Sequence, residues 1–347
     1  MKLKEKEDLL KNAFETVQKC FQSFPVIVLG SGHSCGYKIP GMGLLSDFLI
    51  KEVEKEVLDK DKKVWETLEQ KIKSTDLESS LQELQISQEL SNLIIEKTWK
   101  YIYPFDRKVL TKVILNPSYL SLSKLYKHLF NSTRTRIQVI TPNYDCLAEY
   151  AADAVGYAWS TGFGNGYIGN NYSNSKLQFY KNSSLLRTID IWKVHGSLDW
   201  FASKDGSVYY LPAVTKNPKK YSNVIVTPGI EKYKRTHEEP FRSILSGADH
   251  AIESGESFIC IGYGFNDEHI QPKLISKCKK EDKHIVVITK QMTKAAQTVL
   301  LKGGCKNFVV FEEYSKGTKM YSPKYLAGIE IPGINLWSLG ELLAKVI

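Results

Sequence analysis

The stretch PVIVLGSGHSCGYKIPGMG, residues Pro25–Gly43, decides how this chain is expected to fold. Its apolar residues Val26–Leu29 run directly into a glycine-rich turn. This order is typical of a buried strand that leads into a phosphate-binding loop, because glycine lets backbone N–H groups approach an anion closely. The stretch therefore predicts a strand followed by a nucleotide-binding turn.

Two familiar nucleotide-binding patterns nearly fit this turn, and both fail. A Walker loop requires GxxxxGK followed by Ser or Thr, but Gly32 and Gly36 are too close together. The dinucleotide pattern GxGxxG finds its first two glycines in Gly30 and Gly32, but Cys35 stands where the third belongs. On its own, the GxG element is equally compatible with a simple tight turn.

Further apolar runs extend the strand pattern along the chain and alternate with segments of helical spacing. Such alternation is typical of a Rossmann-like α/β fold, a mainly parallel sheet with helices on both faces. Ligands of these folds bind at the carboxyl ends of the strands, so the polar residues there are the candidates for a site. The predicted strands are Val26–Gly30, Ile137–Asn143, Ile191–Gly196, Ser257–Gly264, His284–Thr289 and Asn307–Glu313.

One long segment, Ser46–Phe130, interrupts the alternation and is predicted to be almost entirely helical. It carries an apolar stripe at helical spacing behind a cap region at Ser74–Asp76, which we interpret as core packing, with a partner interface as the alternative. We expect a Rossmann-like domain of residues 1–45 and 131–347, interrupted by a helical insertion module of residues 46–130. The stripe consists of Leu77, Leu81, Leu84, Leu90, Leu93 and Ile94.

Composition argues against several classes of protein. The N-terminal MKLKEKEDLL has no apolar core of a secretory signal, and no apolar run reaches the ~18 residues of a membrane span, so we expect a cytoplasmic protein without membrane contact. The net charge of +9 includes basic stretches at Lys216–Ser222 and Lys232–His237. We favour a solvated basic surface over direct nucleic-acid binding, because no zinc-finger, basic-zipper or RNA-binding pattern accompanies the charge.

The cysteines and one glycine-rich stretch complete the local predictions. The six cysteines are scattered singly and form no CxxC pair, which argues against a structural zinc and against a disulfide framework. The stretch TGFGNGYIGNNYSNS, Thr161–Ser175, is rich in Gly, Asn and Ser and is expected to be a flexible loop.

Aligned from Gly30, the opening turn reads G-S-G-H-S-x-x-x-x-I-P and resembles the sirtuin signature G-A-G-I-S-x-x-x-G-I-P-D-F-R. The Asp-Phe-Arg that follows in sirtuin deacylases is replaced by Gly41–Gly43. The residues in register with the signature are Gly30, Gly32, Ser34, Ile39 and Pro40.

Further segments follow in the order in which sirtuins carry them. TPNYD (Thr141–Asp145) is similar to the sirtuin T-Q-N-x-D, and VHGSLDW (Val194–Trp200) to the catalytic histidine with its glycine. GYGFND (Gly262–Asp267) is similar to a later nucleotide-contacting strand end. With VTPG (Val226–Gly229), these segments are most similar to sirtuin-like NAD hydrolases of bacterial anti-phage defence, in particular to subunits that assemble with HerA-type ATPases. The resemblance covers most of residues 20–345.

The resemblance implies that NAD is the substrate and that its nicotinamide–ribose bond is hydrolysed. Sirtuin deacylases carry a zinc module with two CxxC pairs, which this chain lacks. The defence hydrolases lack that module too and have no acetyl-lysine peptide channel, so hydrolysis of NAD itself is favoured and no zinc is expected. The resemblance also implies a homo-oligomer, and a HerA-type ATPase or another defence partner that controls the activity.

The resemblance assigns catalysis to Asn143 and His195, and it places Asp145 near the nicotinamide ribose. Histidine suits proton transfer at cellular pH because its ordinary pKa is about 6.5. Asp145 can instead be a helix cap, His195 a core histidine and Asn143 a turn residue. The residues implied to bind NAD are Gly30, Ser31, Gly32 and Ser34, whose turn would offer N–H groups to the phosphates, and Gly262, Gly264 and Asp267, which would bind the adenosine half.

Two other functions stay open from the sequence. One is NAD-dependent protein deacylation, against which the missing zinc cysteines argue. The other is a non-catalytic nucleotide-sensing or scaffold subunit that uses the helical segment and the basic surface for partner contact. The presence of both Asn143 and His195 argues against that second alternative.

Overall fold

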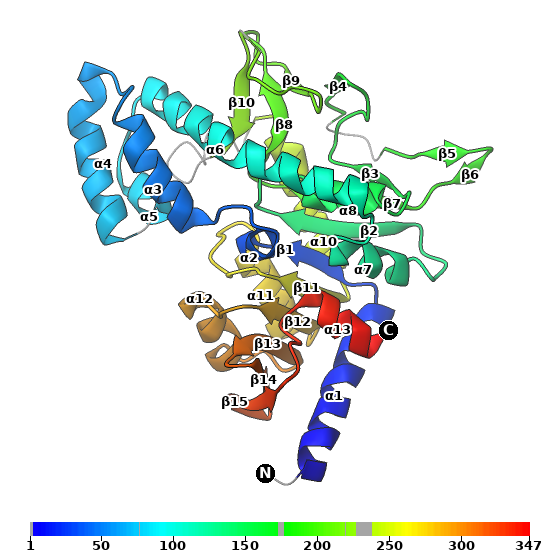
Figure 1. Ribbon diagram of the computed structural model, residues 1–347. Coiled ribbons are helices and arrows are strands. Elements are labelled where there is room, and N and C mark those ends of the chain that lie inside the picture. The colour runs from blue at the N-terminus through cyan, green and yellow to red at the C-terminus, as the bar shows by residue number, and fades with distance from the viewer. Residues whose placement is uncertain (1–2, 76, 173–176, 219, 227–237) are drawn as a thin grey trace.

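A computed structural model describes residues 3–75, 77–172, 177–218, 220–226 and 238–347. Its centre is a nine-stranded sheet in the order β15-β14-β13-β12-β11-β1-β2-β7-β3, in which all pairs from β13 to β3 are parallel (Figure 1). The predicted α/β fold with a mainly parallel sheet is therefore confirmed. The parallel strands are β1 Val26–Leu29, β2 Arg136–Thr141, β3 Ala158–Ser160, β7 Thr188–Lys193, β11 Ser257–Ile261, β12 His284–Thr289 and β13 Phe308–Tyr314.

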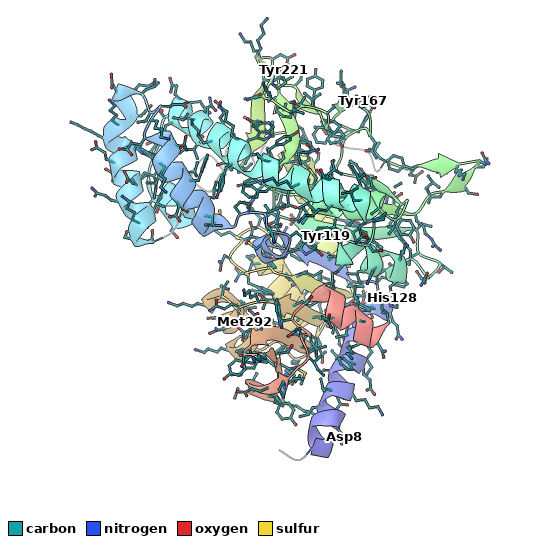
Figure 2. All side chains as sticks on the ribbon, viewed as in Figure 1. Asp8, Tyr119, His128, Tyr167, Tyr221 and Met292 are labelled. Atoms are coloured by element: carbon teal, nitrogen blue, oxygen red, sulfur yellow. The ribbon has the colours of Figure 1, made fainter. Side chains whose placement is uncertain are left out.

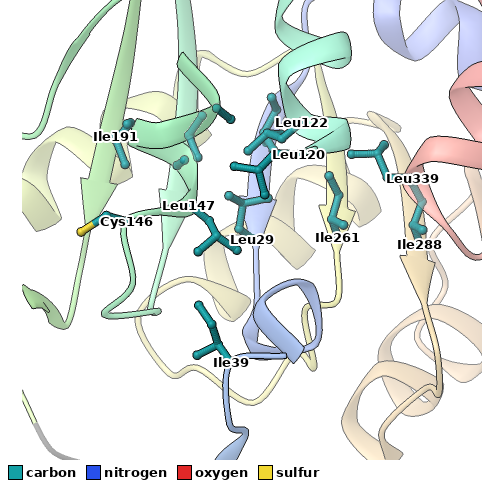
Figure 3. Close-up of a cluster of buried hydrophobic side chains, with 14 of the residues drawn as sticks. Leu29, Ile39, Leu120, Leu122, Cys146, Leu147, Ile191, Ile261, Ile288 and Leu339 are labelled. Carbon is teal, nitrogen blue, oxygen red and sulfur yellow. The ribbon is translucent and has the colours of Figure 1, made fainter. Parts of the chain in front are cut away.

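Helices cover both faces of this sheet, as the alternation along β1 shows. Ile27 and Leu29 belong to one buried cluster, while Val26 and Val28 belong to the other, because successive side chains point to opposite faces. Figure 3 shows the first cluster around Leu29. That face is covered by α1 Leu3–Gln22, α7 Ser121–Leu129, α8 Leu147–Asp153 and α13 Leu339–Val346, and the other by α10 Phe241–Ser254, α11 Gln271–Lys280 and α12 Lys294–Gln297 with the π-helical turn η2 Thr298–Lys302.

Between β1 and β2 the chain is helical, as predicted, and this segment packs onto the sheet. After the short α2 Ser31–Gly36 come α3 Met42–Val53, η1 Asp59–Asp61, α4 Lys62–Ser74, α5 Leu77–Glu83, the 28-residue α6 Gln88–Leu115, and α7. The buried apolar residues of these helices belong to the same cluster as one sheet face. The division into two domains at residues 45 and 131 stays a prediction.

The predicted leucine stripe is core, but it is divided between two helices. Leu77 and Leu81 lie on α5, whereas Leu90 and Ile94 lie on α6, and all four are buried. Ser87 separates the two helices because its side chain caps α6, accepting a hydrogen bond from the Leu90 N–H at 3.1 Å. The expectation of core packing is therefore confirmed.

A second, antiparallel sheet was not expected from the sequence. The predicted strand Ile191–Gly196 is wrong at its end, because β7 stops at Lys193 and Gly196 already begins a strand of the other sheet. Gly196 has a φ of +87°, and a Cβ there would lie 2.1 Å from the Val224 carbonyl oxygen, so the turn requires glycine. The second sheet contains β10 Ser222–Ile225, β8 Gly196–Ala202, β9 Val208–Tyr210 and β4 Gly169–Asn170.

The remaining elements are peripheral to the central strands. The expected loop Thr161–Ser175 contains β4, with the exposed Tyr167 just before it (Figure 2), and its residues 173–176 lie outside the described residues. Residues 227–229 of VTPG and the basic stretch Lys232–His237 also lie outside them. The antiparallel edge strands β14 Gly317–Ser322 and β15 Tyr325–Pro332 extend the large sheet, and β5 Tyr180–Lys181 and β6 Ser184–Leu185 form a separate hairpin.

Candidate active site

The loops that follow β1, β2, β7 and β11 meet at the carboxyl edge of the large sheet and enclose a cavity of about 200 Å³. Every sequence-predicted site residue except Gly32 and Gly262 lines this cavity. The convergence follows from the topology, because these four parallel strands are neighbours and end at the same edge. The predicted residues in its lining are Gly30, Ser31, Ser34, Asn143, Asp145, His195, Gly264 and Asp267.

Three of the predicted glycines join two loops by close backbone contact. A Cβ on Gly30 would lie 2.3 Å from the Gly262 carbonyl oxygen, and one on Gly32 would lie 2.9 Å from the Gly262 Cα. Gly262 has a φ of +59°, and a Cβ there would lie 2.1 Å from the His33 nitrogen. These glycines therefore allow the β1 loop to pack against the β11 loop, which fixes the distance between the two walls of the cavity.

The expectation that Gly30 and Gly32 offer N–H groups to a phosphate is wrong for this conformation. The Gly30 N–H donates to the Ile261 carbonyl at 3.0 Å, and the Gly32 N–H donates to the Gly262 carbonyl, also at 3.0 Å. Both donors are used because the two loops are packed backbone to backbone. These two N–H groups are therefore bonded within the protein.

Asn143, Ser34 and Asp145 form one hydrogen-bonded group on the cavity wall. The Asn143 amide nitrogen donates to the Gly30 carbonyl at 2.9 Å and to the Ser34 hydroxyl at 2.8 Å, and that hydroxyl donates to Asp145 Oδ2 at 2.6 Å. Asp145 Oδ1 accepts from the first N–H of α8, that of Leu147, at 3.2 Å. Asp145 thus binds a helix end and the Ser34 hydroxyl at once, and Asn143 keeps its Oδ1 for a ligand.

His195 and Asp267, from the β7 and β11 loops, are direct neighbours in the lining of the cavity. His195 Nε2 lies 3.0 Å from Asp267 Oδ2, and the two side chains are 12% and 6% exposed. Asp267 Oδ1 accepts from the N–H groups of His269 and Ile270 at 2.9 and 3.0 Å. The structure therefore places Asp267 beside the predicted catalytic histidine, a neighbour that the sequence did not indicate.

The cavity also has an apolar wall that the sequence did not reveal. Ile39 comes from the β1 loop, Met42 and Leu45 from α3, and Ile102 from the middle of α6. Helical spacing identifies these α3 and α6 positions only as core, and nothing local in the sequence indicates that Ile102 meets a loop some 60 residues earlier in the chain. Tyr144, Tyr263 and Asn266 also line the cavity and were not among the predicted site residues.

Two reactive side chains beside the β1 loop are not suited to catalysis. Burial lowers the pKa of His33 to about 4, although the negative charge of Asp145 acts to raise it. The His33 imidazole is therefore neutral at cellular pH. Burial, and then the charge of Asp145, raises the pKa of the Cys35 thiol above its ordinary value. Cys35 is therefore protonated at neutral pH and is a poor nucleophile.

Behind the Asn143–Asp145 loop, charged side chains are buried as a paired group. Lys193 is fully buried, donates to the Asp145 carbonyl, and forms an ion pair with Glu149 at 3.0 Å. Burial alone would lower the pKa of Lys193, but the charge of Glu149 and neighbouring acidic groups outweigh it and raise that pKa. Lys193 is thus a permanent cation that holds the loop from behind.

The long helix α6 reaches the same loop through its own charged residues. Asp106 accepts from the Cys146 N–H at 2.8 Å and from the Tyr150 hydroxyl at 2.5 Å. Arg107 donates to Asp199 of β8 at 2.7 Å. Burial raises the pKa of Asp106 to about 7, although Arg107 opposes this shift. The helical segment is therefore tied to the loop that carries Asn143.

A larger cavity, about 1100 Å³, lies at the opposite edge of the sheet, where β1, β2 and β7 begin. Its charged lining is largely self-paired, since Arg136 binds Asp190 and Arg242 binds Glu239. None of the sequence-predicted site residues lines it. The smaller cavity is therefore the candidate active site.

Within the described ranges no group of three or more His, Cys, Asp or Glu side chains is arranged to hold a metal ion. The expected lack of zinc stays a prediction. No helix among the residues described is long and apolar enough to cross a membrane.

Comparison with known proteins points to one family. A family model described as "SIR2-like domain" matches residues 137–304, a span that includes Asn143, His195 and Asp267. This part of the chain is thus similar to a SIR2-like domain, which supports the coarser part of the predicted resemblance. No curated protein matches the chain.

Solved structures of Sir2 proteins are similar to the chain at low identity. One, titled "Structural Basis for the Mechanism and Regulation of Sir2 Enzymes", has 16% identity over 83% of this chain and 89% of its own, with a TM-score of 0.43. A Sir2 homologue in complex with NAD has 12% identity over 95% and 91%, with a TM-score of 0.43. A Sir2 bound to acetylated peptide has 14% identity over 85% and 89%, with a TM-score of 0.39.

Proposed function

We propose that this protein is an NAD hydrolase that cleaves the bond between nicotinamide and ribose, releasing nicotinamide and ADP-ribose. The observation that carries the proposal is the meeting of Asn143 and His195, from two different loops, in one cavity at the carboxyl edge of the sheet. The SIR2-like domain supports NAD as the ligand, since both residues lie within the matched span. The motif resemblance supports hydrolysis, because Gly41–Gly43 replaces the Asp-Phe-Arg of deacylases.

In the proposed reaction, the bond between C1′ of the ribose and the nicotinamide nitrogen breaks, and its electron pair leaves with nicotinamide. This neutralises the positive pyridinium and leaves C1′ with oxocarbenium character. A water oxygen then bonds to C1′, and the proton that it loses goes to His195 and from there to solvent. Asn143 Oδ1 accepts a hydrogen bond from this water or from a ribose hydroxyl, because both amide hydrogens are already used.

The cavity accommodates one end of the dinucleotide in this proposal. Its volume of about 200 Å³ lies below the roughly 300–1,000 Å³ of sites that enclose a whole ligand. We therefore place the nicotinamide riboside end inside, with the nicotinamide ring against the apolar wall of Ile39, Met42, Leu45 and Ile102. The adenosine half lies outside the cavity, and Gly264 of the β11 loop lines the end of the cavity that this half would leave.

The biological setting is proposed on the motif resemblance alone. It is the depletion of cellular NAD in anti-phage, abortive-infection defence, by a cytoplasmic homo-oligomer that a HerA-type ATPase or another defence partner controls. An uncontrolled NAD hydrolase would damage its own cell, which supports control by assembly. Copurification of the chain with a co-expressed HerA-type ATPase tests the partner separately from the chemistry.

The chemistry is tested by measuring nicotinamide release from NAD with and without an acetylated peptide. We expect peptide-independent release by the wild type, reduced by ~10²–10⁴-fold in His195→Ala and Asn143→Ala because each removes a group that handles the proton or the water. His250→Ala is the matched control, since His250 is exposed and lines the larger cavity. Release only with peptide would assign deacylation, and no release at all would overturn the proposal in favour of a non-catalytic subunit.

A further inference from the structure

The close approach of His195 and Asp267 is not explained by NAD binding alone. Sequence resemblance assigned Asp267 to the adenosine half of the ligand, yet its Oδ2 lies 3.0 Å from His195 Nε2 and both side chains are largely buried. The two atoms are in contact without the alignment of a hydrogen bond. Such alignment often tightens only when the ligand is bound.

The contact determines where the imidazole carries its proton. A carboxylate oxygen can only accept, and two acceptor atoms 3.0 Å apart would repel each other. A single ring proton therefore lies on Nε2, which leaves the lone pair on Nδ1. In the same way, a carboxylate beside a catalytic histidine fixes the tautomer in other enzymes.

The protein holds the Asp267 carboxylate in this orientation from the other side. Oδ1 accepts from the N–H groups of His269 and Ile270, which turns Oδ2 toward His195. The preceding residues form a tight turn in which Gly262 and Phe265 both have a φ of +59°. For Phe265, a bulky residue whose ring is fully buried, this backbone conformation is unfavourable and persists only because the surrounding structure enforces it. The backbone of this segment therefore holds Asp267 in a fixed position.

We propose that Asp267 is a positioning residue that acts through His195. It keeps the Nε2 proton in place, leaves Nδ1 as the basic nitrogen, and stabilises the imidazolium that forms when His195 takes the proton of the attacking water. The bond changes are those of NAD hydrolysis, and Asp267 itself gains and loses no proton. This inference rests on the proposed function for its kinetic consequence, whereas the tautomer of His195 is a property of the protein alone.

The decisive variant is Asp267→Asn, which separates this role from simple capping. The amide oxygen still accepts from the His269 and Ile270 N–H groups, while the amide nitrogen that replaces Oδ2 donates toward His195 and drives the imidazole proton to Nδ1. We expect kcat for nicotinamide release to fall by ~100-fold, as for loss of a general base, with KM for NAD changed by less than ~3-fold. Asp267→Glu keeps the charge and is expected to retain more activity than Asp267→Asn.

Two further measurements test the role of Asp267 even if one of the variants does not fold. In a double-mutant cycle, Asp267→Asn should have no further effect on a His195→Ala background, because Asp267 acts only through the ring. The nitrogen chemical shifts of isotope-labelled histidine, assigned to His195 by comparison with His195→Ala, should report an Nε2–H tautomer in the wild type. If thermal unfolding shows that Asp267→Asn does not fold, the activity of Asp267→Glu and the His195 tautomer of the wild type still test the inference.

The outcomes distinguish the inference from the proposed function. If Asp267→Asn raises KM for NAD and leaves kcat unchanged, Asp267 binds the substrate and does not act through His195. If Asp267→Asn lowers kcat as much on the His195→Ala background as in the wild type, its role is structural. An Nδ1–H tautomer in the wild type would also overturn the inference. If the wild type releases no nicotinamide, the proposed function fails, while the tautomer measurement still tests the Asp267–His195 contact.

Discussion

Two groups of polar side chains lie on opposite sides of the loop that joins β2 to α8, and they differ in what surrounds them. The pocket group, Ser34, Asn143, His195 and Asp267, lines a cavity. The buried group, Asp106, Arg107, Glu149, Lys193 and Asp199, lines neither cavity and pairs internally. Asp145 connects them, since its carboxylate binds Ser34 while its carbonyl accepts from Lys193. The difference agrees with the proposed function, in which the pocket group handles the substrate and the buried group holds the loop in place.

The largest expected effect comes from removing the charge of Lys193. Lys193→Met leaves Glu149 buried without its cation, and breaking a buried pair in this way costs about 3–5 kcal/mol of the free energy of unfolding. Denaturant unfolding measures the loss. Lys193→Met/Glu149→Leu should recover part of it, because no unpaired charge is then buried.

Lys55→Met is the matched control, since Lys55 pairs with Glu52 on the surface and is 62% exposed. It is expected to change the free energy of unfolding by less than ~1 kcal/mol. Equal losses for Lys193→Met and Lys55→Met would mean that the buried group does not support the loop.

The pocket group could be predicted from the sequence to a large extent, and the buried group could not. Asn143 and His195 follow apolar runs, and the carboxyl ends of parallel strands converge whatever the rest of the chain does. Lys193 and Glu149, by contrast, read as ordinary polar residues of a strand and a helix. Their burial depends on pairing between elements 44 residues apart, which no local pattern indicates.

The same reason explains which strands were missed. The central parallel strands β1, β11 and β12 are buried on both faces and consist mainly of apolar residues, so the sequence marks them clearly. β8 continues the apolar run of β7, and only the approach of Gly196 to Val224, a residue of β10, separates the two strands. The exposed and partly buried residues of β15 gave no apolar run. Local patterns therefore found six strands of the central sheet and missed its outer strands β3, β14 and β15 together with the second sheet.

The glycine contact between the β1 and β11 loops is the next test of the pocket. Gly262→Ala combines a φ of +59° with a Cβ only 2.1 Å from the His33 nitrogen, and we expect a loss of about 3 kcal/mol together with loss of nicotinamide release. Gly304→Ala has a φ of +80° and no neighbouring atom within 4 Å, so it should lose only about 1 kcal/mol and keep its activity. Similar behaviour of the two variants would show that backbone strain, not the loop contact, matters at Gly262.

The buried group should also respond to pH through Asp106. Because burial raises its pKa in the folded state to about 7, above its ordinary value of 3.8, the stability that its protonated form provides is present at low pH and is lost as pH rises through 7. Asp106→Asn does not titrate. The variant should therefore gain stability relative to wild type by about 1 kcal/mol per pH unit between pH 5 and 7, and no more above that range. A difference in the free energy of unfolding that stays constant with pH would contradict this assignment.

The smallest expected effect comes from the same chemical change at two tyrosines that belong to neither group, one on α6 and one in the lining of the cavity. The Tyr103 hydroxyl of α6 donates to the Val214 carbonyl at 2.9 Å, and the Tyr144 hydroxyl beside the cavity donates to the Val226 carbonyl at 3.0 Å. Tyr103→Phe and Tyr144→Phe should each lose about 1 kcal/mol of the free energy of unfolding, the ordinary value for one such hydrogen bond. Only Tyr144→Phe should change kcat/KM for NAD, because only Tyr144 lines the cavity. If Tyr103→Phe lowers kcat/KM as much, then α6 controls the chemistry directly, and the distinction between a reacting side and a supporting side of the loop does not hold.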